Sequence, residues 1–274
     1  MSPQQRAPLA VITGASSGIG AALAQAYAAR GWRLVLVGRR GAALDATALA
    51  CAQAQGLEVV DPARLRLLVV DLRDLQAWRA EVARLLHEWE CPQLVVAAAG
   101  ISHGTDLAHA QDLEVADDIM RSNWLAVLGT LSPFIAPMRA RGSGTLVGIA
   151  SVAGVRGLPG HAAYSASKAA LIRSLESLRV ELRPSGVRVV TISPGLIATP
   201  MTAGNPFPMP FLMDARHFAR RAVRAIERGR AYTTIPWPMA VLSKLMHVLP
   251  RGLWDRAVQG RQRKPRNMPH DDGG

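Results

Sequence analysis

The stretch VITGASSGIG, residues 11–20, follows a short apolar run and precedes the helical segment IGAALAQAYAARG. Three glycines, Gly14, Gly18 and Gly20, fall in the turn between the predicted strand and the predicted helix. Glycine has no Cβ, so such a turn lets backbone N–H groups approach a pyrophosphate at the helix N-terminus. The spacing is G-x-x-x-G-x-G rather than the commoner G-x-G-x-x-G. From the turn alone, a tight strand–helix connection without a ligand is the alternative.

The alternation of strand and helix continues along the chain. Apolar residues at helical spacing in residues 74–90 predict a helix with one buried stripe. Strands buried on both faces and separated by helices predict a parallel sheet with right-handed crossovers. We therefore expect a single α/β domain of the Rossmann-like, doubly wound type. The six predicted strands are residues 9–13, 33–38, 65–71, 93–100, 144–151 and 187–195.

The composition is typical of one large folded domain. Of the 274 residues, 49% are hydrophobic and 19% are charged, which excludes disorder for most of the chain. The two cysteines, Cys51 and Cys91, have neither a disulfide framework nor metal-ligand spacing, and they favour a reducing compartment without a metal site. We see no signal peptide and no apolar run of about 18 residues. We expect a cytoplasmic protein, at most attached to a membrane surface.

The second predicted strand ends in Gly38-Arg39-Arg40. Dinucleotide sites often carry an acid at this point, which binds the 2′-hydroxyl of the adenosine ribose. An acid would repel a 2′-phosphate, whereas an arginine pairs with it, so the sequence favours NADP(H) over NAD(H). Solvated arginines without a ligand are the alternative. Asp71 is placed to accept a hydrogen bond from the adenine amino group or, alternatively, to cap the following helix.

Tyr164 and Lys168 stand four residues apart in YSASK, so their side chains share one face of a predicted helix. An ammonium group favours the phenolate form of a tyrosine whose free pKa is about 10, and the pair can then exchange a proton closer to neutral pH. Ser151 closes the fifth predicted strand. By itself Y-x-x-x-K is a common pattern.

Five motifs occur in order: TGASSGIG, Asn123 in RSNWLAVLGT, IASVAG, YSASK and SPGLIAT. In this order and spacing the chain resembles the short-chain dehydrogenase/reductase family, from about residue 8 to about residue 200. The resemblance implies an NADP(H)-dependent oxidoreductase that interconverts a carbonyl and an alcohol. We also expect a homo-oligomer, a dimer or a tetramer.

The resemblance implies a catalytic role for four residues. Tyr164 is the general acid in ketone reduction and the base in alcohol oxidation, and Lys168 lowers its pKa and binds the nicotinamide ribose. Ser151 holds the substrate carbonyl oxygen, so two hydroxyl donors stabilise the charge that develops there. Asn123 lies at a helix distortion and keeps a water that connects Lys168 to solvent. The implied cofactor contacts are Gly14, Ser16, Ser17, Gly18, Ile19, Gly20, Arg39, Arg40, Asp71, Leu72, Ala98, Gly100, Tyr164, Lys168, Pro194, Gly195, Ile197 and Thr199.

The resemblance implies more detailed roles for residues 194–199 and draws attention to the segment that ends at Gly100. Pro194 and Gly195 shape the floor under the nicotinamide, and Ile197 and Thr199 contact its carboxamide. The family usually has N-N-A-G after the fourth strand, whereas this chain has A-A-A-G, which ends at Gly100. Two side-chain amides that would cross-link the sheet are missing, and we expect this to affect stability and the cofactor loop more than proton transfer.

The loop PMTAGNPFPMPFLMD after Thr199 has four prolines and six apolar side chains, with no charge before Asp214. We expect a stiff apolar substrate lid over about residues 196–215, which favours a hydrophobic, lipid-like carbonyl or alcohol. Packing on the protein's own helices or on a second subunit is the alternative. We expect His161 at the surface, with a place beside the site as its alternative.

Two other functions stay open from the sequence. A 3-oxoacyl-thioester or carrier-protein reductase would use the basic surface to attract an acidic carrier. A non-catalytic NADP-binding module is the second, although the four catalytic residue types are all present. Aromatic residues near the C-terminus are few and form no stacking array, so we expect no nucleic-acid partner.

The basic charge is concentrated near the C-terminus, because residues 214–266 hold thirteen of the 32 Lys and Arg residues against three acids. We expect the domain to span residues 1–235 and a basic, amphipathic, helical extension to span 236–274, disordered near its end.

In this extension, the polar residues Ser243, Lys244 and His247 share one face of the helix MAVLSKLMHVL. A helix of about 16 Å is too short to cross a bilayer core of about 30 Å. We expect it to lie on an anionic membrane surface, with burial against its own pocket or a second subunit as the alternatives. Trp237 and Trp254 would lie at headgroup level. The residues expected beside anionic lipid are Arg256, Arg261, Arg263, Lys264 and Arg266.

Overall fold

A seven-stranded, fully parallel sheet forms the centre of the protein, with strand order β3-β2-β1-β4-β5-β6-β9. The computed structural model describes residues 7–260 and 262–266. The doubly wound parallel fold predicted from the sequence is confirmed. The strands of the sheet are β1 (Leu9–Thr13), β2 (Arg33–Gly38), β3 (Leu65–Val69), β4 (Leu94–Ala97), β5 (Gly144–Ile149), β6 (Val187–Pro194) and β9 (Tyr232–Ile235).

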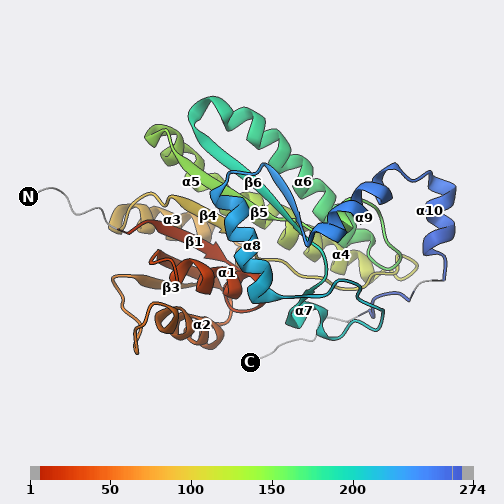
Figure 1. Cartoon of the computed structure of the whole chain (residues 1–274), viewed down its shortest axis with the longest axis horizontal. Coiled ribbons are helices and arrows are strands. Elements are labelled where there is room, and N and C mark those ends of the chain that lie inside the picture. The colour runs from red at the N-terminus through yellow and green to blue at the C-terminus, as the bar shows by residue number, and fades with distance from the viewer. Residues whose placement is uncertain (1–6, 261, 267–274) are drawn as a thin grey trace, which may run out of the picture.

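The helices lie on both faces of the sheet (Figure 1). A small separate ladder, β7 (Ile197–Ala198) with β8 (Met213–Asp214), brackets the predicted lid. The helices are α1 (Gly18–Ala28), α2 (Gly41–Ala54), α3 (Leu75–Glu88), α4 (Asp112–Met120), α5 (Ala126–Arg141), α6 (Ala162–Leu182), α7 (Pro200–Ala203), α8 (Ala215–Glu227), α9 (Trp237–Val248) and α10 (Arg251–Val258). Shorter helical turns span Arg121–Leu125, Val152–Gly154 and Arg183–Ser185.

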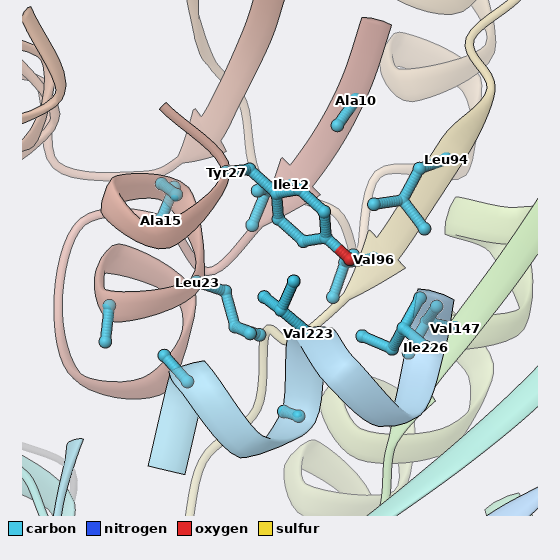
Figure 2. Close-up of a cluster of buried hydrophobic side chains, with 14 of the residues drawn as sticks. Ala10, Ile12, Ala15, Leu23, Tyr27, Leu94, Val96, Val147, Val223 and Ile226 are labelled. Carbon is cyan, nitrogen blue, oxygen red and sulfur yellow. The ribbon is translucent and has the colours of Figure 1, made fainter. Parts of the chain in front are cut away.

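Successive residues of the central strands enter opposite cores. Ile12 of β1 faces a cluster with Tyr27 of α1 and Val223 of α8, which Figure 2 shows in close-up. Val11 faces the other side, where Trp78 of α3 packs edge-on against Phe134 of α5 with ring centroids 6.3 Å apart. Both faces of the sheet are therefore covered by hydrophobic cores, as the apolar runs predicted.

The edge strand β9 was not predicted. It pairs in parallel with the end of β6, from Thr191 opposite Tyr232 to Pro194 opposite Ile235. Its sequence YTTI is short and half polar, so it lacks the long apolar run that marked the other strands. The last residues of the predicted domain, which ends at residue 235, therefore belong to the central sheet. The division between residues 1–235 and 236–274 stays a prediction.

Helix α9 packs on the sheet edge through Met239, which is 5% exposed, and an added Cβ at Gly195 would lie 2.7 Å from its Cγ. The expected C-terminal helices are therefore present, and they begin directly behind the predicted nicotinamide floor. The end that we expected to be disordered, residues 267–274, lies outside the described residues. Among the described helices, none is long and apolar enough to cross a membrane.

Candidate active site

One cleft at the carboxyl edge of the sheet collects every residue predicted for the site. In a doubly wound sheet this edge is where ligands bind, because the loops that leave neighbouring strands diverge there. The predicted residues that line it are Gly14, Ser16, Ser17, Gly18, Ile19, Gly20, Arg39, Arg40, Asp71, Leu72, Ala98, Gly100, Asn123, Ser151, Tyr164, Lys168, Pro194, Gly195, Ile197 and Thr199. Their roles stay predictions, but their assembly in one place is a feature of the fold.

The glycine-rich turn is so tightly folded that two of its glycines, Gly14 and Gly20, leave no room for a Cβ. Gly14 has φ of 65°, and a Cβ there would lie 2.8 Å from the backbone nitrogen of Ala99. A Cβ on Gly20 would lie 2.2 Å from the carbonyl oxygen of Gly14. Within the described chain, Ser17 precedes α1 without a side-chain hydrogen bond to the first turn. The first residues of α1, Gly18 to Gly20, line the cleft, and a helix N-terminus without a side-chain cap is suited to a phosphate.

Three arginines surround the end of the cleft where we predict that the adenosine of the cofactor binds, which we call the adenosine end. The side chain of Arg40 donates to Ser17 Oγ at 3.0 Å, on the glycine-rich turn. Arg39 is 57% exposed and lies 4.0 Å from the carboxylate of Asp71. The third is Arg73, which also lines the cleft and which the sequence analysis missed. The concentration of positive charge here is chemically suited to a 2′-phosphate.

The alternative prediction for Asp71, that it caps the following helix, is wrong. The cap is Asp74, whose carboxylate accepts from the backbone N–H groups of Gln76 and Ala77. Asp71 instead accepts from Arg73, whose Nη2 lies 2.6 Å from Oδ2. Burial disfavours the charged form of Asp71, but the hydrogen bonds from Arg73 outweigh it and hold the pKa of the carboxyl below its usual value.

The catalytic candidates meet at the centre of the cleft. Tyr164 and Lys168 lie one turn apart on α6, and Lys168 Nζ lies 5.9 Å from the centroid of the Tyr164 ring. Lys168 is 5% exposed and donates to the carbonyl oxygen of Ile149 at 2.9 Å. Ser151 does not end β5, which stops at Ile149, but begins the short helical turn that follows. Leaving the ladder turns its hydroxyl toward Tyr164.

The electrostatics of this pair differ from the prediction that Lys168 lowers the pKa of Tyr164. Burial raises the pKa of Tyr164 above its usual value, and a hydrogen bond with Ser151 lowers it only in part. Burial also lowers the pKa of Lys168 to about 8. The reason is that the ammonium group is bound to Ile149 O beside the ring rather than to the phenol oxygen. Desolvation therefore has more effect on both groups than their mutual attraction.

The helix distortion expected at Asn123 is present as a π-helical turn over Arg121–Leu125. The buried Asn123 amide accepts from the N–H of Ile101 at 2.8 Å and donates to Ile101 O at 2.9 Å. Its Nδ2 also lies 3.2 Å from Ser167 Oγ on α6. The Asn123 side chain thus fixes the loop after β4 to the helix that carries Tyr164.

The A-A-A-G segment is bound through its backbone to Thr13. Its Oγ1 accepts from the backbone N–H groups of Ala98 and Ala99 at 3.2 and 3.4 Å. A hydroxyl at the end of β1 therefore cross-links the sheet at this level. Thr13 had no predicted role, although it stands directly before Gly14 in the sequence.

The predicted apolar lid lines the cleft only in part. Met201 and Pro200 face the cleft, together with Thr202. Phe211 and Leu212 are 55% and 46% exposed. Of the six apolar side chains expected in the loop after Thr199, only Met201 lines the cleft among the described residues. The physical reason is that β8 pairs with β7 and directs the second half of the loop away from the cleft.

His161 lies beside the site rather than at the surface. Its ring packs edge-on against Tyr164 and against Phe207, each with a centroid distance of 6.2 Å. Burial lowers the pKa of His161, a hydrogen-bonding contact with Pro159 O raises it in part, and the charge of Lys264 lowers it further. The alternative that we kept open for this residue is therefore the one observed.

The C-terminal basic residues do not form the free lipid-facing cluster that we predicted. Arg266 binds the carboxylate of Asp112 with both ends of its guanidinium, at 2.9 and 2.8 Å. Arg263 lies 3.1 Å from Asp106. Internal acids therefore neutralise two of the five residues, because the chain turns back toward the cleft. A third, Arg261, lies outside the described residues.

Comparisons with known proteins identify the family and the fold. A family model described as short chain dehydrogenase matches residues 8–206. A protein of Myxococcus xanthus, called an uncharacterized oxidoreductase, is 43% identical over 252 residues, covering 91% of this chain and 96% of that protein. A short-chain dehydrogenase from Sphingobium yanoikuyae, solved in complex with NADPH, is 27% identical with a TM-score of 0.73, covering 89% of this chain and 97% of that chain. A Burkholderia cenocepacia short chain dehydrogenase, 24% identical, has the same fold at a TM-score of 0.77 and covers 94% of this chain and 100% of that chain.

The fold and the cleft define an oxidoreductase that acts on a CH–OH group with a nicotinamide nucleotide, NAD(P)(H). The chain belongs to the short-chain dehydrogenase/reductase family. Its general reaction is the NAD(P)-dependent interconversion of a carbonyl and an alcohol.

Proposed function

We propose that the protein is an NADPH-dependent reductase of a hydrophobic carbonyl compound. The observation that carries the cofactor preference is the end of β2, where Gly38 stands in place of an acid and is followed by Arg39 and Arg40. Arg40 contacts Ser17, so its charge lies beside the glycine-rich turn, which supports this proposal. A 2′-phosphate at this end would meet charge-assisted donors, whereas NADH would leave them unpaired.

The chain's own groups would transfer the proton. The cofactor, when bound, supplies the hydride in reduction and accepts it in oxidation. Ser151 and Tyr164 would both donate to the carbonyl oxygen, and the hydroxyl proton of Tyr164 would pass to it as the alkoxide forms. The high pKa of buried Tyr164 keeps it protonated, ready to donate. Lys168 would hold the nicotinamide ribose and supply positive charge beside the phenolate that remains.

The apolar side of the cleft favours a hydrophobic substrate. Ile101, Met201 and Pro200 line it beyond the catalytic hydroxyls. Phe207 lies behind His161, in edge contact with its ring. A site of this kind binds mainly by burial of apolar surface, with a few polar groups fixing the orientation.

The test is a screen of NADPH oxidation against aldehydes, ketones and 3-oxoacyl thioesters, repeated with NADH at equal concentration. We expect turnover with apolar aldehydes or ketones, at least about tenfold more efficient with NADPH. Tight NADPH binding without turnover of any carbonyl would support the non-catalytic module instead. Turnover restricted to oxoacyl thioesters would support the thioester reductase.

We also propose that α9 attaches the enzyme to an anionic membrane surface. Four apolar side chains at helical spacing are more than half exposed: Trp237, Val241, Leu245 and Val248. Ser243, which we expected on the polar face, is 6% exposed and points inward. The apolar face is therefore the outer one, which suits an interfacial helix, although the internal ion pairs of Arg263 and Arg266 leave fewer cations for lipid.

Vesicle sedimentation tests this second proposal. The variant Trp237→Ser/Leu245→Ser should stay in solution with phosphatidylglycerol vesicles that sediment the unchanged protein. The matched control Leu113→Ser/Val180→Ser removes exposed apolar residues from α4 and α6 and should still sediment. Light scattering gives the molar mass of both proteins. If neither protein binds vesicles and Trp237→Ser/Leu245→Ser has half the molar mass of the unchanged protein, the apolar face of α9 contacts a second subunit instead.

A further inference from the structure

The last described segment of the chain returns to the part of the cleft that holds Ile101 and Met201, where we propose that the substrate binds. We call this part the substrate end. Figure 1 shows it running back from α10 toward α7. Residues 262–266 contact the loop after β4, where Gly104 N donates to Pro265 O at 3.3 Å. A Cβ on Gly104 would lie 2.2 Å from the carbonyl oxygen of Lys264, and one on Gly160 would lie 3.0 Å from the Cβ of Arg263. Both positions admit the segment because they have no side chain.

Two ion pairs hold this segment in place. Arg266 binds Asp112, whose side chain is only 4% exposed, and Arg263 binds Asp106. The two acids are themselves linked, because the Asp106 N–H donates to Asp112 Oδ2 at 2.6 Å. A bidentate pair with a buried carboxylate fixes geometry more firmly than an exposed pair does. The two residues between the arginines, Lys264 and Pro265, are therefore held in position.

Lys264 is the charged residue of these two, and its ammonium group has no internal counter-ion among the described residues. Its Nζ donates to Ser102 Oγ at 3.0 Å and approaches Met201 O at 3.4 Å, both of them uncharged. The ammonium group is partly buried, and burial lowers its pKa. A desolvated cation without a counter-ion is unfavourable, so this site is suited to an anion.

The position of Lys264 connects it with the reaction. Met201 lines the catalytic cleft, as does Ile101, the neighbour of Ser102. Burial and the charge of Lys264 both lower the pKa of His161, whose ring packs on Tyr164. The ammonium group thus contacts two segments that border the cleft, at Ser102 beside Ile101 and at Met201.

We propose that Lys264 determines substrate specificity by binding an anionic group on the far end of the carbonyl substrate. The substrate class is then an oxo compound with an apolar body and an acid group, such as a carboxylate. This inference rests on the proposed function of the cleft as a carbonyl reductase. It concerns only which carbonyl compounds bind well.

A matched pair of probes tests the proposal: 4-formylbenzoate and its methyl ester, which differ in the charge at one end. The unchanged enzyme should bind and reduce the acid at least about tenfold more efficiently, the range expected for one charge-assisted contact. Lys264→Met should reduce this preference to within about twofold, and Lys264→Arg should restore most of it. Lys244→Met removes an exposed lysine from α9 and serves as the charge-matched control.

Binding and turnover are measured separately, by quenching of bound NADPH fluorescence and by NADPH oxidation. Tighter binding of the acid without reduction of either probe would refute the reductase function and leave the Lys264 site standing. Equal binding of acid and ester by the unchanged enzyme would overturn the Lys264 site. Equal losses for both probes in Lys264→Met would assign Lys264 a structural role and overturn it as well.

Discussion

The adenosine end and the substrate end of the cleft are built in different ways. The adenosine end consists of residues next to the ends of β1 to β4, such as Gly14, Arg40 and Asp71. The substrate end is assembled from segments far apart in the sequence. Lys264 meets Ser102 across 162 residues, and Arg266 meets Asp112 across 154.

This difference separates what the fold supplies from what the individual protein adds. A parallel sheet always brings its strand ends together, so an adenosine site built on those ends needs few further contacts. The substrate end requires a loop, a short helix and a C-terminal segment to meet, and each contributes side-chain contacts of its own. Changes there can alter the substrate without disturbing the cofactor.

The largest effect is expected where the two ends meet, at Tyr164. Tyr164→Phe removes the proton donor and leaves the packing in place, so turnover should fall by about a thousandfold. The dissociation constant of NADPH, measured by fluorescence, should change less than about twofold. Tyr232→Phe, on the exposed edge strand, is the control and should retain full activity. Substantial turnover in Tyr164→Phe would refute the assigned proton transfer.

The next effect concerns the adenosine end alone. Arg39→Asp should weaken NADPH binding by about 10- to 100-fold, equivalent to about 1.5–3 kcal/mol, because a phosphate contact is replaced by repulsion. NADH binding should change little or improve. Arg220→Asp makes the same charge change on the exposed side of α8 and should affect neither cofactor. Equal losses for NADPH and NADH would contradict a 2′-phosphate site.

The adenosine end was easier to predict from the sequence than the substrate end. The glycine turn, the Tyr164–Lys168 spacing and the arginines after β2 are local patterns, and the structure brings them into one cleft. Asn123 was placed at a helix distortion through the family resemblance, and a π-helical turn is found there. These features depend on short stretches of chain, whose geometry the local sequence largely determines.

The features that were missed depend on contacts between distant segments. Thr13 accepts a hydrogen bond from the loop after β4. Arg73 is held at the cleft by ion pairs with Asp71 and Asp118, and the second of these acids is 45 residues away in the sequence. The tail was expected beside lipid because its arginines were counted without Asp106 and Asp112, which lie more than 150 residues earlier. No periodicity in the sequence reports such pairings, since they are set by tertiary packing.

A third prediction concerns Lys168, at the junction of the two ends. Because burial lowers its pKa to about 8 in the folded state, the unfolded chain binds more protons between pH 8 and the usual lysine pKa of about 10.5. Stability should therefore rise with pH in this window through this group. From pH 8 to 9.5 the contribution is about 1–2 kcal/mol in the free energy of unfolding of the cofactor-free protein.

Urea unfolding at both pH values, compared with Lys168→Met, isolates this term. The unchanged protein should gain more stability than Lys168→Met does as the pH rises, because the variant lacks the buried ammonium group. Burial also raises the pKa values of Cys51, Cys91 and Tyr164, so these groups ionise first in the unfolded chain as the pH rises. Their contributions are common to both proteins, and the difference between the two proteins reports Lys168. Parallel curves for the two proteins would mean that Lys168 is solvated in the folded state.

The smallest effect is expected at the substrate end, from Arg266→Gln. The change leaves the buried carboxylate of Asp112 without its bidentate partner, which should release residues 262–266 from the loop after β4. The KM of the carbonyl substrate should rise by about three- to tenfold, a loss of about 1 kcal/mol in binding. NADPH binding should stay unchanged, because no described contact joins this segment to the adenosine end. Arg263→Gln is the matched control: its pair with Asp106 is more exposed, so its effect should be smaller.

Hydrogen exchange of the Gly104 amide, which donates to Pro265 O, gives a readout independent of activity. It should accelerate in Arg266→Gln and much less in Arg263→Gln. Faster exchange without a change in KM would show that the segment can leave without affecting the substrate, and the two ends of the cleft would then differ less than we have argued.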